Sequence, residues 1–447
     1  MTMFSSATMK HLGRVVGFGL IVVGASACGG AKPVAAKAPA AAPAAADPKV
    51  AHAEVSESAK GPYAAGWKAY IAGDLQAARS AFESAQRADA TSPNPPYALG
   101  IVLEHLGEAA SARASFRAAL VAKPEFDLAA VAYARSLSAS GDTAGADSFL
   151  TERRSKFPQS AITLAALADV KSESGNHGDA QQMAQDALRL NPNEAFAMVV
   201  IARDHYRARK IDLARYALQA VLDGFGDASP ARAKDNAEAA LLRGLLEREY
   251  GRRAAAMEAF EHASTHQPDL VEALLQLGAM RLEAGNATTA LAVLEPAVRF
   301  APRSALAQSN VGDAYRLLLR TPEALKAFDA AEKLDPALTS VHYNRALLYL
   351  FTANVAGMTP VGQVEAAIAE LERYKSMKNA KGAADDVDEL LSRAKSRQAE
   401  LKIAAGVAAE AAAAPAAPAP AEPAAPGTAP AEAPGAPAAR APATPAK

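Results

Sequence analysis

The strongest feature of the sequence is a repeat about 34 residues long that runs through most of the chain. Aligned units share a small residue at position 8, alanine at 20, a large apolar residue at 24, a small residue at 27 and proline at 32. The second unit shows this pattern best, with Gly100, Ala112, Phe116, Ala119 and Pro124. Units begin at residues 59, 93, 127, 161, 195, 237, 271, 305 and 339. Such a chain folds as a linear array in which each unit packs on its neighbours.

The residue types at these positions predict two helices in each unit. A small residue at position 8, such as Gly66, lets the two helices approach closely, and alanine at position 20 is expected across from it. Leucine there would overpack the contact at a cost of about 1–3 kcal/mol. Glycines at position 15, such as Gly73, accept the left-handed conformation that ends the first helix. Prolines near position 32 then end the second helix.

This pattern resembles the tetratricopeptide (TPR) family over about three-quarters of the chain. The resemblance implies an all-α fold, a right-handed superhelical α-solenoid of TPR helix pairs over residues 58–378. The step from the fifth unit to the sixth is longer than the period, and Ser229 before Pro230 predicts that the first helix of the sixth unit starts about two turns early. A longer turn around residues 353–360 is expected in the ninth unit. Residues 383–405 are expected to form a charged capping helix that closes the array.

The N-terminus has the order of a secretory signal. Lys10 and Arg14 precede a short apolar run, and small residues lead to Cys28, the only cysteine. The run is about half of the ~20 residues that span a bilayer. Residues 25–28 resemble the lipobox of bacterial lipoproteins, which implies that residues 1–27 are removed and Cys28 carries fatty acids such as palmitate. By the same resemblance Gly29, where aspartate would retain the protein at the inner membrane, implies the outer membrane facing the periplasm. A plain secretory signal is the alternative.

Two segments rich in alanine and proline flank the repeats. Residues 28–57 predict a flexible linker behind the lipid, and residues 406–447 a disordered tail, because neither has side chains large enough to form a core. The tail either threads the peptidoglycan mesh or has no role.

Charge and motifs exclude several functions. Acidic and basic residues nearly cancel at a net charge of −1, so nucleic acid is not an expected partner. No phosphate-binding, nucleophile-elbow or zinc-protease motif occurs, so we expect no enzyme activity and no cofactor. His262 and His266 lie four residues apart on one helix face, but no third ligand stands at metal spacing, so two surface histidines without a metal are favoured. Asp385, Asp386, Asp388 and Glu389 are expected to complement a helix dipole.

The candidate site is the concave face. In TPR proteins it is lined by positions 2, 5, 9, 12 and 13 of each first helix. Aromatic and arginine side chains of the kind that dominate binding hot spots stand at these positions. The predicted partner-binding residues are Tyr63, Trp67, Tyr70, Tyr97, Arg135, Arg203, Tyr206, Arg207 and Arg248. Asp169 lies at position 9 between Arg135 and Arg203, so an internal ion ladder is the alternative for the arginines.

The layout as a whole resembles TPR lipoproteins of the bacterial outer membrane, among them pilotins for secretins, subunits of polysaccharide secretion channels and gliding-motility lipoproteins. The resemblance implies a non-enzymatic, membrane-anchored scaffold or assembly factor for a cell-envelope complex. Its partners would be envelope proteins or peptides in the TPR groove, with the membrane held through Cys28. The alternative is an activator of a peptidoglycan synthase or another periplasmic enzyme.

Overall fold

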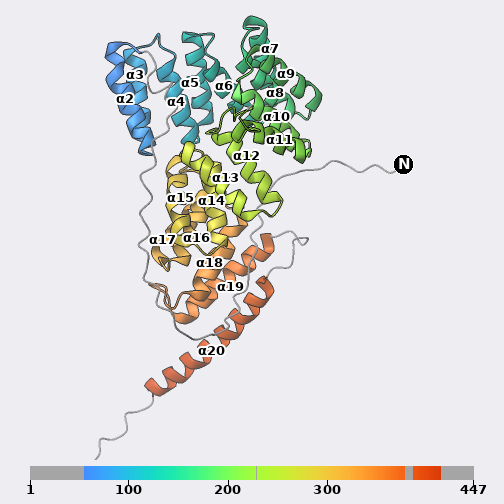
Figure 1. Ribbon diagram of the computed structural model, residues 1–447. Coiled ribbons are helices and arrows are strands. Elements are labelled where there is room, and N and C mark those ends of the chain that lie inside the picture. The colour runs from blue at the N-terminus through green and yellow to red at the C-terminus, as the bar shows by residue number, and fades with distance from the viewer. Residues whose placement is uncertain (1–54, 228, 378–385, 414–447) are drawn as a thin grey trace, which may run out of the picture. The chain divides into compact units, whose positions relative to one another are not determined.

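The computed structural model describes residues 55–227, 229–377 and 386–413, and within them the secondary structure is α-helical apart from one isolated β-bridge (Figure 1). The helices are α2 (Glu57–Ile71), α3 (Leu75–Ala88), α4 (Asn94–His105), α5 (Ala109–Ala122), α6 (Asp127–Ala139), α7 (Thr143–Lys156), α8 (Ala161–Glu173), α9 (His177–Leu190), α10 (Ala195–Arg207), α11 (Ile211–Leu222), α12 (Ala237–Glu249), α13 (Arg253–His266), α14 (Val271–Glu283), α15 (Ala287–Phe300), α16 (Ala305–Leu317), α17 (Thr321–Leu334), α18 (Thr339–Phe351), α19 (Pro360–Met377) and α20 (Val387–Ala413). The predicted signal peptide, Cys28 and most of the linker lie outside the described residues.

Consecutive helices pair from α2·α3 to α18·α19, and each pair packs on the next. The chain is therefore an α-solenoid of TPR-type helix pairs, and the predicted fold class is confirmed. The first helices of the pairs begin within two residues of the predicted unit starts, for example α8 at Ala161 and α14 at Val271.

Glycine at position 8 makes room for a bulky residue of the partner helix. A Cβ added at Gly244 would lie 2.4 Å from the ring of Phe260, and one at Gly278 would lie 2.4 Å from Leu294. Phe260 is at position 24, so the large apolar residue of the second helix is the nearest neighbour of the glycine. The expectation that alanine at position 20 also lies across from the glycine stays a prediction.

Position 15 has a left-handed backbone in the first eight units, whether or not it is a glycine. The glycines there have positive φ, such as 79° at Gly73 and 75° at Gly285. Three units lack the glycine. In the fifth and eighth units Arg209 and Leu319 adopt φ of 61° and 59° in its place, whereas Ala353 of the distorted ninth unit does not have a positive φ. A side chain in this conformation costs about 1–2 kcal/mol, so the geometry of the unit overrides the local preference.

The extra residues before the sixth unit form a loop, and the prediction of an early helix start is wrong. Pro230 pairs with Gly224 in the isolated bridge, and Ser229 accepts a hydrogen bond from the Phe225 N–H at 2.7 Å. α12 begins only at Ala237, where the Asn236 side chain caps it by accepting from the Ala239 N–H at 2.8 Å. The N-cap of α12 is thus Asn236, seven residues after Ser229.

The chain divides into two compact units, Met1–Gln398 and Ala399–Lys447. α20 crosses this boundary and continues to Ala413, so the predicted end of the capping helix at residue 405 is wrong. Its final turns are rich in alanine, the residue with the highest helix propensity, and the first proline follows only at Pro415. No helix in the described ranges is both long enough and apolar enough to span a bilayer.

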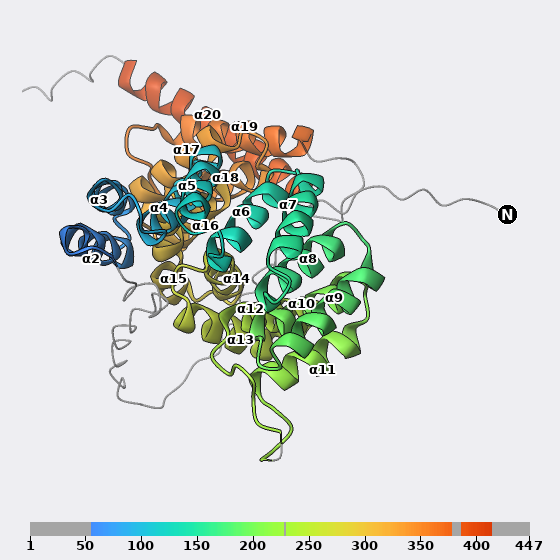
Figure 2. The ribbon, with the colours of Figure 1, turned by 90° about the horizontal axis from the view of Figure 1, so that it is seen from above.

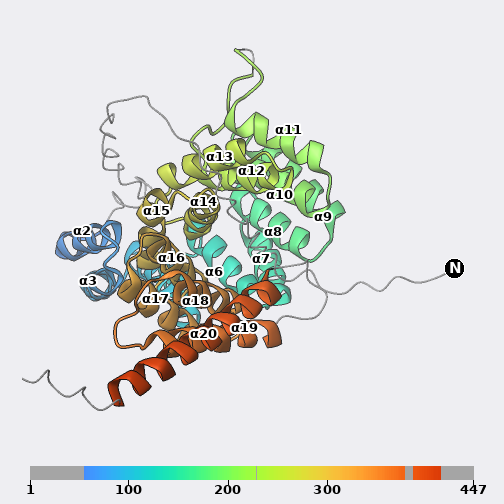
Figure 3. The same ribbon diagram turned by 90° about the horizontal axis from the view of Figure 1, so that it is seen from below.

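Within the first compact unit the helix pairs follow a curve that brings the start of the array back to its sixth and seventh pairs (Figure 2, Figure 3). The hydroxyl of Tyr70 on α2 donates to Asp269, which lies in the turn before α14. Phe300 at the end of α15 belongs to the same apolar cluster as Tyr70. Units about 200 residues apart in the sequence are therefore packed together.

Candidate functional site

The aromatic positions of the first two units are part of the core. Tyr63, Trp67 and Tyr70 are only 2%, 7% and 4% exposed, and the Trp67 ring lies 5.3 Å from the Phe82 ring centroid. The expectation that these aromatics are exposed on an open groove is wrong for these three residues. Tyr63 and Trp67 pack against Phe82 of the partner helix α3, and the curvature of the array brings Phe300 onto Tyr70. Tyr97 is partly buried, and its ring lies 5.3 Å from that of Phe126.

Tyr70 belongs to a polar network that joins early and late units. Its hydroxyl oxygen lies 2.8 Å from His105 Nε2, and His105 Nδ1 lies 2.9 Å from the carbonyl oxygen of Phe300. Burial, together with the Asp269 carboxylate, raises the pKa of Tyr70 well above its ordinary value, so its hydroxyl stays protonated. Burial opposes ionisation of Asp269, but hydrogen bonds from His105 and Tyr70 outweigh it and lower the Asp269 pKa.

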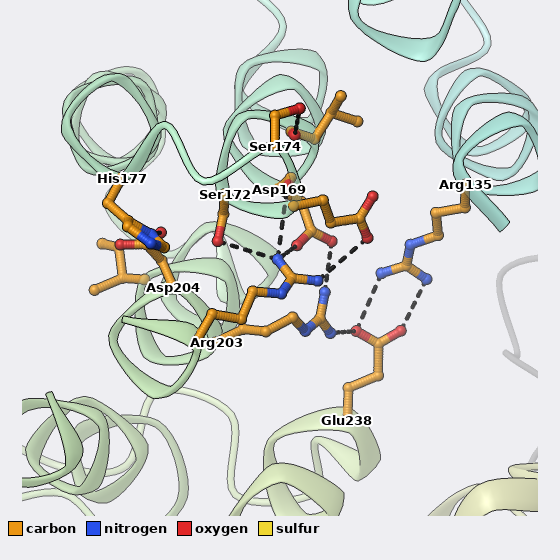
Figure 4. A network of polar contacts seen from close by, with 12 residues as sticks. Arg135, Asp169, Ser172, Ser174, His177, Arg203, Asp204 and Glu238 are labelled. Atoms are coloured by element: carbon orange, nitrogen blue, oxygen red, sulfur yellow. Dashed lines mark hydrogen bonds and ion pairs between the residues drawn. The ribbon is translucent and has the colours of Figure 1, made fainter. Parts of the chain in front are cut away.

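The arginines of the concave face form an internal ion ladder (Figure 4). Arg135 on α6 makes a forked contact with Glu238 on α12, at 2.8 Å and 3.1 Å. Arg203 on α10 donates to Glu238 at 3.0 Å and to Asp169 at 2.5 Å, and Arg207 donates to Asp169 at 2.8 Å. Of the two alternatives for the arginines, internal pairing is the one that the structure contains.

Glu238 is the acid that bridges distant units in this ladder. Burial alone would raise the pKa of its carboxyl, but the charges of Arg135 and Arg203 and the hydrogen bonds from them outweigh burial and lower the pKa to about 2. Glu238 lies at position 2 of its unit, which is one of the concave positions, but the sequence did not single it out because its partner Arg135 is 103 residues away.

The remaining predicted residues lie nearer to solvent. Arg248 is exposed and donates to the side chain of Gln276, whereas Tyr206 is half-buried. Burial and the neighbouring Glu249 carboxylate raise the pKa of Tyr206. Partner binding by Tyr206 and Arg248 stays a prediction.

An exposed aromatic pair lies outside the predicted site. Tyr216 on α11 is 62% exposed, and Phe225 in the loop before the sixth unit is 42% exposed. Their rings are stacked with centroids 4.8 Å apart. We call these two residues the aromatic patch. The signal that points to it in the sequence is the extra loop itself, since insertions in repeat arrays often carry binding residues.

The two histidines of α13 have a third potential ligand in the structure. The His262 and His266 ring centroids are 4.5 Å apart, and His266 Nε2 lies 3.6 Å from Asp235 Oδ1. Asp235 belongs to the turn before α12, so the statement that no third ligand is available does not hold in three dimensions. Burial and the neighbouring His266 lower the pKa of His262.

Comparisons with known proteins give weak matches. No protein-family model matches the sequence, and no curated protein is significantly similar to it. The solved structures that resemble it include the APC/C hetero-tetramer Cut9–Hcn1, at 16% identity over 75% of this chain and 76% of that chain, with a TM-score of 0.46. Yeast Tom70 is similar at 16% identity over 66% and 65% of the two chains, with a TM-score of 0.45. YrrB, described as a TPR protein with an unusual peptide-binding site, is similar at 18% identity over 43% of this chain and 96% of that chain, with a TM-score of 0.32. The fold of this chain is assigned from the helix pairs described above and not from these similarities.

Proposed function

We propose that the protein is a non-enzymatic scaffold that binds other proteins and serves a complex of the bacterial cell envelope. The observation that carries this proposal is the array itself, because the helices from α2 to α19 all belong to consecutive pairs. Such an array presents a long surface of side chains held at fixed spacing. Solenoids bind extended partners on surfaces of this kind.

The aromatic patch supplies side chains suited to such binding. Tyrosine and other large side chains dominate binding hot spots because each buries much area at small entropic cost. We therefore place a partner contact at the loop between the fifth and sixth units, in addition to the concave positions Tyr206 and Arg248.

Crosslinking and pull-down from native envelopes tests the contact. The full chain is compared with the double variant Tyr216→Ala/Phe225→Ala and with a matched control, Val121→Ala/Leu319→Ala, which removes two apolar side chains that are 78% and 76% exposed. We expect the first variant to lose a partner that the control keeps. Capture of the same partners by all three proteins would contradict the assignment.

Membrane anchoring is the second part of the proposal. It is supported by the sequence around Cys28, which resembles a lipobox, and by the Ala/Pro-rich linker that follows. Cys28→Ser should move the protein from the membrane fraction to the soluble periplasmic fraction, since the fatty acids on Cys28 would hold it to the membrane. Retention in the membrane fraction would overturn the anchor without affecting the scaffold.

The complex served would be a motility, pilus or secretin, or polysaccharide secretion machine, with the protein on the outer membrane facing the periplasm. The support for this is the layout of anchor, linker and repeat array. If the tail threads the peptidoglycan mesh, deletion of residues 411–447 should release the protein from purified sacculi. Unchanged association with the sacculi would end this part of the proposal.

A further inference from the structure

The loop before the sixth unit brings an acid to the two histidines of α13. Within the helix hairpin α12·α13 the chains run in opposite directions, so the start of α12 lies beside the end of α13. Asp235 ends the turn before α12, and His262 and His266 lie in the last two turns of α13. One ligand atom from each of the three residues lies within 4.8 Å of the other two.

These distances suit a transition-metal ion. Zinc bonds to histidine nitrogen and carboxylate oxygen are about 2.0–2.2 Å long, which puts the ligand atoms about 3.3 Å apart in a tetrahedral site. His266 Nε2 and Asp235 Oδ1 are already 3.6 Å apart. Rotation of half-exposed histidine side chains is sufficient to close the remaining gap.

The donor set decides which metal fits. Two imidazoles and one carboxylate suit Zn²⁺ and its neighbours Co²⁺, Ni²⁺ and Cu²⁺, whereas Ca²⁺ and Mg²⁺ prefer oxygen ligands throughout. The charges around the site favour a cation as well. The positive charge of Arg243 acts on His262, but Asp223 neutralises it and accepts a hydrogen bond from Arg243 at 3.2 Å. The carbonyl end of α13 points its negative dipole end to the same place.

We propose that Asp235, His262 and His266 form a binding site for a divalent transition-metal ion of the zinc type, with water completing the coordination. The bound ion would link the end of α13 to the turn before α12 and so fix the end of the loop that carries Phe225. The beginning of this loop is already held, through the contact between Arg243 and Asp223. This site is independent of the proposed scaffold function, since it rests on α12, α13 and the loop alone.

Zinc titration of the full chain by calorimetry tests the proposal, with Cys28→Ser as the parent protein because a free thiol also binds zinc. We expect one site that His262→Ala, His266→Ala and Asp235→Asn each weaken at least about tenfold, since loss of a residue that only supports a ligand already costs about 10–100-fold. The matched control is His177→Ala. His177 also pairs with an aspartate, at 2.7 Å from Asp204, but it does not belong to a group of three potential metal ligands in the described part of the chain.

Two further measurements keep the result independent of folding defects. Cobalt bound to the parent should give the visible absorption bands of a tetrahedral site, and Asp235→His, which supplies a third imidazole, should bind zinc more tightly than the parent. Zinc should also slow amide exchange in residues 233–236. Equal zinc affinity of the parent and the His262→Ala/His266→Ala double variant would overturn the proposal, and so would equal affinity of the parent for Mg²⁺ and Zn²⁺.

Discussion

Replacement of Glu238 by glutamine tests how much the ion ladder stabilises the array. Glutamine keeps the size of the side chain but removes the charge that Arg135 and Arg203 share. Removal of one partner from a fully buried ion pair costs about 3–5 kcal/mol, whereas an exposed pair contributes about 0–1 kcal/mol. The Glu238 and Arg203 side chains are 30% and 21% exposed. We therefore expect Glu238→Gln to reduce the free energy of unfolding by about 2 kcal/mol near neutral pH.

The lowered pKa of Glu238 gives the sign of the pH dependence. A fall from the ordinary 4.5 to about 2 corresponds to about 3 kcal/mol as an upper limit, since solvent screens part of it. Because the folded-state pKa lies below the unfolded-state value, this stability is complete above about pH 4.5 and is lost as the pH falls towards 2. The difference between wild type and Glu238→Gln should thus be largest near pH 7 and fall by more than about half at pH 3.

The assay is urea unfolding of the full chain at both pH values, with amide exchange of α6 and α12 to locate the effect, because repeat arrays can open in parts. Glu258→Gln is the matched control, since it removes the same charge from an exposed position on the neighbouring helix α13. Two results would refute a stabilising role of the ion ladder. One is that both variants are as stable as the wild type at pH 7. The other is that the loss of unfolding free energy in Glu238→Gln is as large at pH 3 as at pH 7.

Three further substitutions test the packing of the units. Leu319→Gly should stabilise the protein by about 0.5–1 kcal/mol by relieving the left-handed backbone, whereas Leu317→Gly, at the last residue of α16, should destabilise it by up to about 1 kcal/mol. Thermal unfolding gives both signs, and a loss of stability in Leu319→Gly would contradict the strain. Gly244→Ala should reduce the free energy of unfolding by about 1–3 kcal/mol because the added Cβ would meet the Phe260 ring. The control Gly61→Ala, whose Cβ meets nothing within 4 Å, should be neutral or stabilising. Equal stability of the two variants would be inconsistent with this packing. Tyr70→Phe should speed amide exchange in α2, because it removes the hydroxyl that joins Asp269 and His105. Loss of this hydroxyl should reduce stability by about 1–3 kcal/mol. Unchanged protection of α2 would show that the hydroxyl does not hold the early and late units together.

Contacts inside one unit could be predicted from the sequence, because they repeat. Gly66, Gly100 and Gly244 recur at one position, and this recurrence alone indicates that two helices approach closely there. The loop before the sixth unit broke the pattern, and there local signals competed. Pro230 after Ser229 is a plausible helix start, but Asn236 offers a cap next to the residue at which the repeat register resumes, and packing of the whole pair favours that start.

The candidate site was less predictable, because it depends on contacts between units far apart. The positions of Trp67 and Tyr70 identify them as concave. The pattern within one unit does not indicate that Trp67 packs into its own helix pair or that a later unit covers Tyr70. The same holds for Glu238, which reaches Arg135 across three units. Asp235 is a simpler case, since the histidine pair was visible in the sequence and only the path of an irregular loop was needed to add the third ligand.

The curvature of the array also decides how a partner could reach the predicted aromatic positions. Phe300 covers Tyr70, and its burial contributes about 2 kcal/mol. The Tyr70 hydroxyl contacts both His105 and Asp269, and hydrogen bonds of this kind contribute about 1 kcal/mol each. A peptide that binds to Tyr70 has to break these contacts first, so closure of the array and binding at this place exclude each other. The affinity of such a peptide for the closed protein would be reduced by the whole cost of opening, about a hundredfold or more. Surfaces that need no opening, such as the aromatic patch, therefore have the energetic advantage as binding sites.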